Sequence, residues 1–475
     1  MTVLDMPSRL WHCHNMQSDY QDFLASKTLR AKHVGIEPPP LVSHLYPFQR
    51  QCVEFALRAG RVGLFLDTGL GKTECQLEFC QKALEASNGR ALIMTPLAVA
   101  GQTKRRADRW KYPESRVVRS AYEVKSGINI CNYDSLHKLD PDAFDVVAFD
   151  EASILKSFIG KTTRSLISAF KGTRFRMVAT ATPAPNDHTE IAGYSEFLEV
   201  LSPLEMLSRF FINDTSKASQ EWRLKNHAVN EFWDWMSSWS RMASMPSDLG
   251  DKDDGFILPP YKVIRHRAKD TAVDRDLADM FGIVSMSAIN MHDIKRQTSV
   301  ARAEVAASII DASPSSACII WCDTDYEADE IMKVLPRATE IRGSMSVEQK
   351  EARALRFETG DVKHLVTKPS CCGFGLDWSH CDRMIFVGRS FSYETWYQAV
   401  RRCWRYGQKK NVEVHLILAE GENEIGRIID RKATDHDQMK VSMRAAMARA
   451  MGKSAARRDA YDPKHIAELA SWVQA

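Results

Sequence analysis

The fold is decided by the stretch Val62-Gly63-Leu64-Phe65-Leu66-Asp67-Thr68-Gly69-Leu70-Gly71-Lys72-Thr73. Val62–Leu66 is apolar and too short for a helix, so it predicts a buried strand. A stretch of helical composition, Glu74–Ala86, follows the glycines. A buried strand that passes through a glycine-rich turn into a helix is typical of a parallel sheet covered by helices.

The glycine-rich turn carries phosphate-binding chemistry. Gly69 and Gly71 let backbone N–H groups approach phosphate oxygens, and the helix N-terminus adds a partial positive charge. Lys72 supplies a charge for the β- and γ-phosphates, and the Thr73 hydroxyl can bind Mg²⁺. We therefore expect ATP on this loop, with Mg²⁺. The nucleotide-binding residues expected here are Thr68, Gly69, Leu70, Gly71, Lys72 and Thr73. Leu66 departs from the strict pattern, which has a glycine at that position.

A second apolar run, Val146–Phe149, ends in the carboxylates Asp150 and Glu151. Two carboxylates directly after a buried strand are costly without a cation. Beside the phosphate loop, Asp150 would hold Mg²⁺ and Glu151 would orient or deprotonate the attacking water. The alternative is that Glu151 only favours the N-terminus of a following helix. The nearby phosphate loop favours the metal-site interpretation.

Short apolar runs alternate with helical stretches in two separate parts of the chain, which predicts an α/β protein with two parallel-sheet lobes. The expected strands of the second lobe are Ala317–Trp321, Lys363–Thr367, Met384–Val387 and Val412–Leu418. The expected division of the chain is an N-terminal extension at 1–40, a first lobe at 41–202, a helical, aromatic-rich insert and loop at 203–257, a second lobe at 258–430 and a basic helical tail at 431–475.

The insert and the tail each leave a choice between packing and nucleic-acid binding. The insert has large side chains at helical spacing, which favours a buried face over base stacking: Phe232, Trp235, Met236, Trp239 and Met242. The tail has cations every four or five residues: Lys440, Arg444, Arg449, Lys453 and Arg457. One interpretation is a helix whose basic face is solvated while its other face packs on a lobe. The other is direct contact with nucleic-acid phosphates, for which Lys440 and Arg444 are the proposed residues.

Bulk composition excludes several classes of protein. The chain has 475 residues, 44% of them hydrophobic and 26% charged. No apolar run approaches the roughly 18 residues of a membrane span, and Met1–Arg30 lacks a signal-peptide stretch. We therefore expect a cytoplasmic protein without a membrane partner. The 11 cysteines are scattered and form no CxxC pair, so neither a zinc site nor a disulfide framework is expected. A net charge of +3 indicates little about nucleic acid.

Over roughly Leu45–Glu424 the chain resembles the helicases of superfamily two, and among them most closely the Swi/Snf-type DNA translocases. Leu45–Gln49 resembles the adenine-reading segment, which implies that Gln49 reads the base. Ala91–Pro96 and Cys131–Asp134 resemble segments that grip a nucleic-acid strand. The contacts implied there are Thr95, Pro96, Asn132 and Tyr133.

The resemblance continues through the second lobe. Leu365–Lys368 would contribute Thr367 and Lys368 to nucleic-acid binding. Gly373–Asp377 resembles the motif that faces both ATP and nucleic acid, through Gly375 and Asp377. Gln398–Gln408 resembles the arginine-finger helix. There Arg402 and Arg405 are three apart and hence expected on one helix face, within reach of a γ-phosphate.

Three segments depart from the family pattern. Ser153 replaces the usual histidine, Thr180-Ala181-Thr182 replaces threonine-glycine-threonine, and Arg389–Tyr393 stands where Trp-Asn-Pro is usual. The first departure concerns how ATP is coupled to nucleic acid.

The resemblance implies two RecA-like lobes with ATP and Mg²⁺ between them, and a catalytic set of Lys72, Glu151, Arg402 and Arg405. It implies an ATP-driven translocase or helicase on DNA, with duplex or branched DNA favoured over single strands. A compact bacterial or phage motor for replication, recombination or repair would fit, with a monomer as the default. The alternatives are an RNA helicase and a clamp that binds ATP without motor activity.

Overall fold

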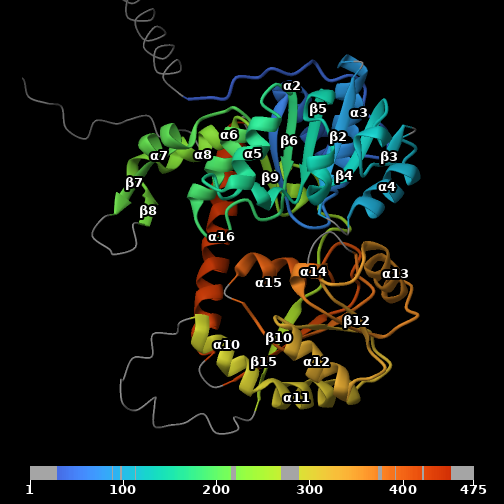
Figure 1. Cartoon of the computed structure of the whole chain (residues 1–475). Helices are drawn as coiled ribbons and strands as arrows, with labels where there is room; N and C mark the ends of the chain where they lie inside the picture. Colours follow the sequence, from blue (N-terminus) through green and yellow to red (C-terminus); the bar gives the residue numbers. More distant parts are fainter. Residues whose placement is uncertain are drawn as a thin grey trace, which may run out of the picture.

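A computed structural model describes residues 29–450, apart from 88, 97–98, 113, 215–220, 269–287, 373–376, 391 and 420–421. It contains two α/β lobes, one above the other in Figure 1, and a long helix that runs beside both of them. The fold class expected from the sequence is confirmed, because each lobe is built on a parallel sheet with helices packed against it.

The first lobe is built on a parallel sheet of seven described strands in the order β3-β4-β2-β5-β6-β1-β9. In chain order the strands are β1 Arg61–Leu66, β2 Arg90–Thr95, β3 Ser115–Val117, β4 Gly127–Asn132, β5 Val146–Asp150, β6 Phe175–Ala179 and β9 Ser240–Ala243. The main helices are α2 Pro47–Ala59, α3 Lys72–Ser87, α4 Ala100–Arg109, α5 Lys161–Ala169 and α6 Ile191–Phe197. β5 and β6 are buried along their whole length, which explains why their sequences are apolar without alternation.

The segment expected to be a helical insert is only partly helical. It contains α7 Pro203–Phe210, the antiparallel pair β7 Phe211–Asp214 and β8 Glu221–Leu224, and α8 Val229–Ser237. It then supplies β9, which pairs with β1 and satisfies the backbone of that sheet edge. The first sheet therefore continues past the boundary expected at residue 202.

The aromatic face of the insert is buried. Phe232, Trp235 and Trp239 are at most 1% exposed and belong to the core of the first lobe. Base stacking by these rings is therefore excluded in this arrangement. Helical spacing in the sequence continues through Met242, but the helix ends at Ser237 and the chain turns into the sheet.

The second lobe has a parallel sheet of six described strands in the order β10-β15-β14-β11-β13-β12. These are β10 Tyr261–Arg267, β11 Cys318–Trp321, β12 Thr339–Ile341, β13 His364–Thr367, β14 Arg383–Phe386 and β15 Val412–Leu418. Its helices are α10 Ala288–Gln297, α11 Ser299–Asp311, α12 Asp325–Val334, α13 Val347–Glu358, α14 Pro369–Cys372 and α15 Tyr393–Val400. All four strands expected from the sequence are present within one residue of their predicted ends.

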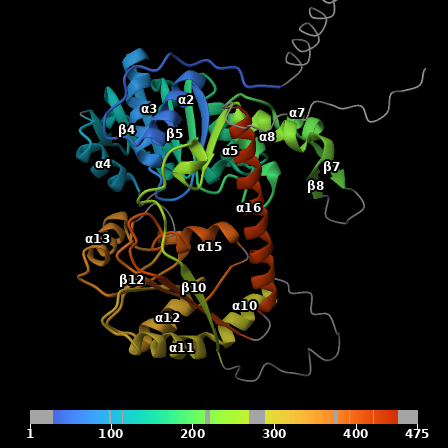
Figure 2. The same cartoon turned by 180° about the vertical axis from the view of Figure 1, so that it is seen from behind.

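Helix α16, Asn423–Ala450, connects the lobes (Figures 1 and 2). Near its start Ile429 packs against Tyr393 of the second lobe. Further along, Met443 and Met447 are fully buried in the core of the first lobe. The helix has 28 residues, so it is about 42 Å long at 1.5 Å per residue. Within the described residues, no helix has both the length and the apolar character of a membrane span.

Candidate nucleotide site between the lobes

The two lobes enclose a cavity of about 490 Å³, which is within the range of cofactor sites. From the first lobe it is lined by His44, Tyr46, Gln49, Thr68, Gly69, Gly71, Lys72, Thr73, Glu74, Val99, Gln102, Thr103, Arg106, Arg109, Trp110, Asp150 and Glu151. From the far side it is lined by Phe256, Asp377, Ser379, Arg402, Arg405, Tyr406 and Gly407. The cavity therefore brings together the phosphate loop, the carboxylates and the arginines that the sequence placed far apart.

The phosphate loop joins β1 to α3 in a conformation that needs its glycines. Gly69 has a φ of 94° and Gly71 a φ of 81°, both in the left-handed region. A Cβ at Gly71 would also collide with the Gln49 amide. Lys72 is buried, and its Nζ donates to the Leu66 carbonyl at 3.0 Å. Leu70 is buried in the core of this lobe, so its contribution is mainly its backbone.

The two carboxylates lie at the end of β5, beside the loop. Asp150 and Glu151 are 5% and 6% exposed. Burial and the adjacent Glu151 raise the pKa of Asp150 to about 6. Gln76 donates to Asp150 Oδ1 at 3.3 Å. Two buried carboxylates beside one lysine and the Thr73 hydroxyl fit a divalent cation, with Thr73 and Asp150 as the residues that would hold Mg²⁺.

Glu151 does not cap the short helix that follows it. Its backbone is left-handed, with φ 47° and ψ 56°, and its side chain forms no capping hydrogen bond. Its Oε2 instead accepts from Gln398 Nε2 of the second lobe at 3.2 Å. The carboxylate is therefore oriented across the cleft, as a group that positions water would need to be.

The arginines expected on a finger helix lie beyond its end. Helix α15 ends at Val400, so the expectation that Arg402 and Arg405 share one helix face is wrong. If the helix continued, the Gln398 carbonyl would accept from the backbone N–H of Arg402. Here the carbonyl accepts instead from Arg402 Nε at 2.9 Å. Both arginines nevertheless line the cavity and are at most 7% exposed. Arg405 pairs with Asp377 at 3.5 Å.

Aromatic rings form one part of the cavity wall. Phe256 stacks on Tyr406 at 4.5 Å between ring centroids, and Tyr46 meets Phe256 edge-on at 5.2 Å. Gln49 accepts from the Tyr46 N–H at 3.0 Å and donates to the Leu70 carbonyl at 3.1 Å. The amide expected to read adenine is thus fixed between the rings and the loop. Tyr406 was not among the residues expected at the nucleotide site, although it directly follows Arg405 in the finger motif.

The residues expected to grip nucleic acid lie at the carboxyl ends of strands. Thr95 and Asn132 end β2 and β4, and Thr367 ends β13. Tyr133 follows β4, and its hydroxyl donates to the Asp150 carbonyl at 2.7 Å. Lys368 pairs with Asp325 at 2.8 Å. Tyr133 therefore gives the segment Cys131–Asp134, which follows β4, a direct hydrogen bond to the carboxylate strand.

Two further predicted residues are Pro96, expected to contact nucleic acid, and Gly375, expected to face the nucleotide. Pro96 directly follows β2 and is half-buried. Gly375 lies outside the described residues.

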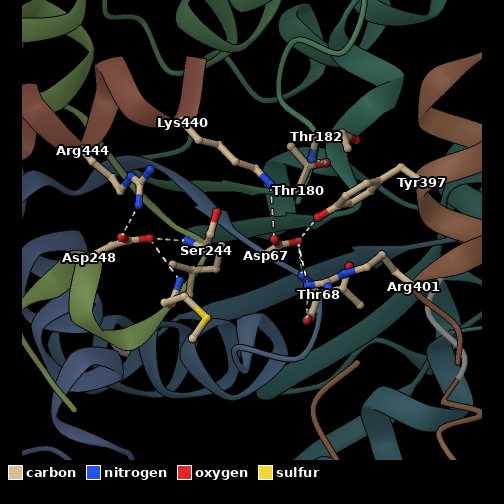
Figure 3. A network of polar contacts seen from close by, with 12 residues as sticks. Asp67, Thr68, Thr180, Thr182, Ser244, Asp248, Tyr397, Arg401, Lys440 and Arg444 are labelled. Carbon is tan, nitrogen blue, oxygen red and sulfur yellow. Dashed lines mark hydrogen bonds and ion pairs between the residues drawn. The ribbon is translucent and has the colours of Figure 1, made fainter. Parts of the chain in front are cut away.

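The tail cations expected to contact phosphates are paired with carboxylates of the first lobe (Figure 3). Lys440 is 3.3 Å from Asp67 and Arg444 is 3.1 Å from Asp248. Met443 and Met447 pack α16 against the core of the first lobe, which brings Lys440 and Arg444 close to these carboxylates. These ion pairs favour the interpretation of a packed helix, and the phosphate contact of Lys440 and Arg444 stays a prediction. Lys453 and Arg457 lie outside the described residues.

Comparisons with known proteins match the chain to helicase-related sequences. Residues 301–407 match the family model of the helicase conserved C-terminal domain. The Xenopus tropicalis "SWI/SNF-related matrix-associated actin-dependent regulator of chromatin subfamily A-like protein 1" is 32% identical over 161 residues, 32% of this chain and 17% of that protein. The Bacillus subtilis (strain 168) "Putative ATP-dependent helicase/translocase YwqA" is 21% identical over 462 residues, 84% of this chain and 49% of that protein.

The chain thus spans about half the length of one curated relative and less than a fifth of the other. The solved "Sulfolobus solfataricus SWI2/SNF2 ATPase core in complex with dsDNA" is 16% identical. The match covers 88% of this chain and 98% of that one, at a TM-score of 0.41. The family match and the curated relatives confirm the resemblance to the Swi/Snf-like ATPases of helicase superfamily two.

Proposed function

The chain carries a helicase C-terminal domain of the Swi/Snf-like kind, and from that premise we propose that it is an ATP-driven motor on DNA. One observation carries the proposal. Lys72 and Glu151 of the first lobe line the same cavity as Arg402 and Arg405 of the second. A nucleotide in this cavity would have its phosphates contacted from both lobes.

The division of the site between lobes suggests how hydrolysis is controlled. Lys72 and the loop N–H groups would hold the phosphates, and Glu151, oriented by Gln398, would position the attacking water. Mg²⁺, when bound by Thr73 and Asp150, would neutralise phosphate charge. Arg402 and Arg405 would stabilise the charge of the transition state, a contribution of about 10³–10⁵ in rate in related systems. Opening the cleft would withdraw both arginines and stop turnover.

DNA is the proposed track, and closure is the proposed link between DNA and ATP. Support comes from the Swi/Snf-related relatives and from the segments at the ends of β2, β4 and β13. Differential grip by these segments in open and closed states would produce steps along duplex or branched DNA. We further propose replication, recombination or repair as its setting, and translocation rather than strand separation as its basic activity.

The proposal is tested by measuring ATP turnover of the full chain with blunt duplex, fork, four-way junction, single-stranded DNA and RNA. Turnover should be stimulated most by duplex or branched DNA. Glu151→Gln and Lys72→Ala should each abolish turnover, and both should retain DNA binding. Glu85→Gln makes the same chemical change as Glu151→Gln on the exposed side of α3, so it should match the wild type.

Two outcomes would overturn the proposal in favour of the alternatives. Stimulation by RNA alone would indicate an RNA helicase. ATP binding without turnover on every nucleic acid would indicate a clamp. Unchanged turnover in Glu151→Gln would remove this cavity as the hydrolysis site.

A further inference from the structure

Asp67, at the start of the phosphate loop, is surrounded by side chains from other parts of the chain (Figure 3). Its Oδ1 lies 3.1 Å from an Nη of Arg401 and accepts from the Tyr397 hydroxyl, both from the second lobe. Its Oδ2 lies 3.3 Å from Nζ of Lys440 on α16. Its Oδ1 also accepts from the Thr68 N–H at 2.9 Å. One carboxylate therefore joins the first lobe, the second lobe and the tail helix.

This cluster lies behind the cavity wall. Neither Asp67 nor Arg401 lines the cavity, whereas Thr68, Arg402 and Arg405 do. Asp67 and Arg401 have side chains that are 8% and 5% exposed, so solvent screens their attraction only weakly. Burial opposes ionisation of Asp67, but Arg401 and Lys440 outweigh it and hold its pKa well below the ordinary value.

Arg401 binds the phosphate loop at two points. The same guanidinium nitrogen that faces Asp67 also donates to the Thr68 carbonyl at 3.1 Å. Thr68 directly precedes Gly69 of the loop, and Arg401 directly precedes Arg402 in the finger turn. A shift of Arg401 would therefore move the finger turn relative to the phosphates.

We propose that Asp67 and Arg401 are a positioning pair that sets the finger turn against the phosphate loop, with Lys440 as the link to α16. The pair acts through Arg402 and Arg405 and does not touch the nucleotide. The inference rests on the proposed function, because it assigns the pair a role in that reaction. A misplacement of about 1 Å at a reacting centre costs on the order of 100-fold in rate.

The experiment compares Arg401→Gln, Asp67→Asn and the double variant of the full chain. Asparagine keeps the oxygen that accepts from Thr68 and Tyr397, so Asp67→Asn removes mainly the charge. Each single variant should lower kcat with duplex DNA by about tenfold to a hundredfold, with KM for ATP little changed. The double variant should be no worse than the poorer single variant, because the two residues act through one contact.

Two controls separate positioning from general damage. Arg449→Gln breaks an exposed ion pair between α16, the helix that carries Lys440, and Asp234 of α8, and it should leave kcat unchanged. Titration with ADP alone and with ADP plus fluoroaluminate gives a readout that loop damage would not reproduce. The positioning variants should bind ADP normally and lose affinity for the fluoroaluminate complex, because finger contacts strengthen in the transition state. Arg401→Lys, which keeps the charge, should recover part of the loss.

The possible results are distinct. A wild type without ATP turnover would overturn the proposed function itself. An active wild type with unchanged Arg401→Gln, or with losses that multiply in the double variant, would overturn the positioning pair. Equal loss of ADP and fluoroaluminate binding would also overturn it, because that would indicate a damaged loop.

Discussion

Arg402 and Arg405 are buried arginines whose pKa values lie below the ordinary value for arginine. Burial and the neighbouring Arg405 lower the pKa of Arg402 to about 10. Burial also lowers the pKa of Arg405, against the opposing effect of Asp377. A buried cation of depressed pKa is stabilised by any anion that enters beside it. The phosphates of a nucleotide are the anions that this cavity would admit.

The roles of the two arginines are tested by Arg405→Ala and Arg402→Ala. Each should lower turnover by about 10³-fold or more, because finger contacts of this kind supply that magnitude. ATP affinity should fall much less, since Lys72 and the loop remain. Quenched-flow turnover and direct nucleotide titration measure the two effects. Loss of nucleotide binding in proportion to turnover would contradict the finger role.

Asp67 predicts a specific pH dependence of stability. Its pKa in the folded chain lies below the ordinary value of 3.8, so its contribution is fully present above that value and is lost as pH falls toward the folded pKa. Asp67→Asn leaves the buried Arg401 and the partly buried Lys440 without this carboxylate, which costs about 3–5 kcal/mol. Urea unfolding should show a constant wild-type advantage from pH 8 to about pH 5. The advantage should shrink below about pH 4, and a difference that grows there would contradict the ion pair.

Residues that act within one local segment could be predicted, and residues that meet across the lobes could not. Gly69, Gly71 and Lys72 lie within a single turn, so the local sequence was enough to suggest them as phosphate-binding residues. Tyr397 and Asp67 are 330 residues apart in sequence, and nothing in either segment indicates the other. No role was predicted for Arg401, because the finger motif assigns functions only to its neighbours Arg402 and Arg405.

Helices and strands were predictable where one periodicity dominated. β15 was placed without error because Val412–Leu418 first alternates apolar and polar residues and then ends in three aliphatic ones, a pattern typical of a strand. β9 was missed because its residues continue the helical spacing of α8, and only pairing with β1 makes them a strand. The end of α15 was missed because it depends on the Arg402 side chain binding the Gln398 carbonyl. In both places, tertiary contacts decide whether the residues continue the helix or leave it.

Helix α16 gives a prediction about salt dependence. Arg444 and Arg449 pair with Asp248 and Asp234 of the first lobe, so they are not expected to displace counterions from DNA. Replacing both by glutamine should change the log–log salt slope of duplex binding by less than about one unit. Stability should fall by no more than about 1 kcal/mol for each pair, since both pairs are partly exposed. A slope flattened by about two units would mean that these arginines contact phosphates.

At the scale of the molecule, a second contact joins the lobes away from Asp67. Glu394 of α15 pairs with Lys156 at 2.6 Å and accepts from the Thr182 hydroxyl at 3.1 Å. Lys156 follows the carboxylate strand, and Thr182 follows β6. Together with α16 and the Asp67 cluster, this contact ties the closed arrangement together at several separate places. Under the proposed function, closure would depend on the whole interface, and both ATP and DNA would couple to it.

The coupling can be measured in a chain that binds ATP without hydrolysing it. In the Glu151→Gln background, duplex DNA should raise ATP affinity by the same factor by which ATP raises DNA affinity, because coupling free energies are reciprocal. Factors of about 5–150 are typical. Adding Glu394→Ala should reduce both factors equally. The variant removes a contact with Lys156 and Thr182 that joins the lobes only when they are closed, so it weakens closure for both ligands. A change in one factor alone, or none in either, would show that the Glu394 contact takes no part in closure.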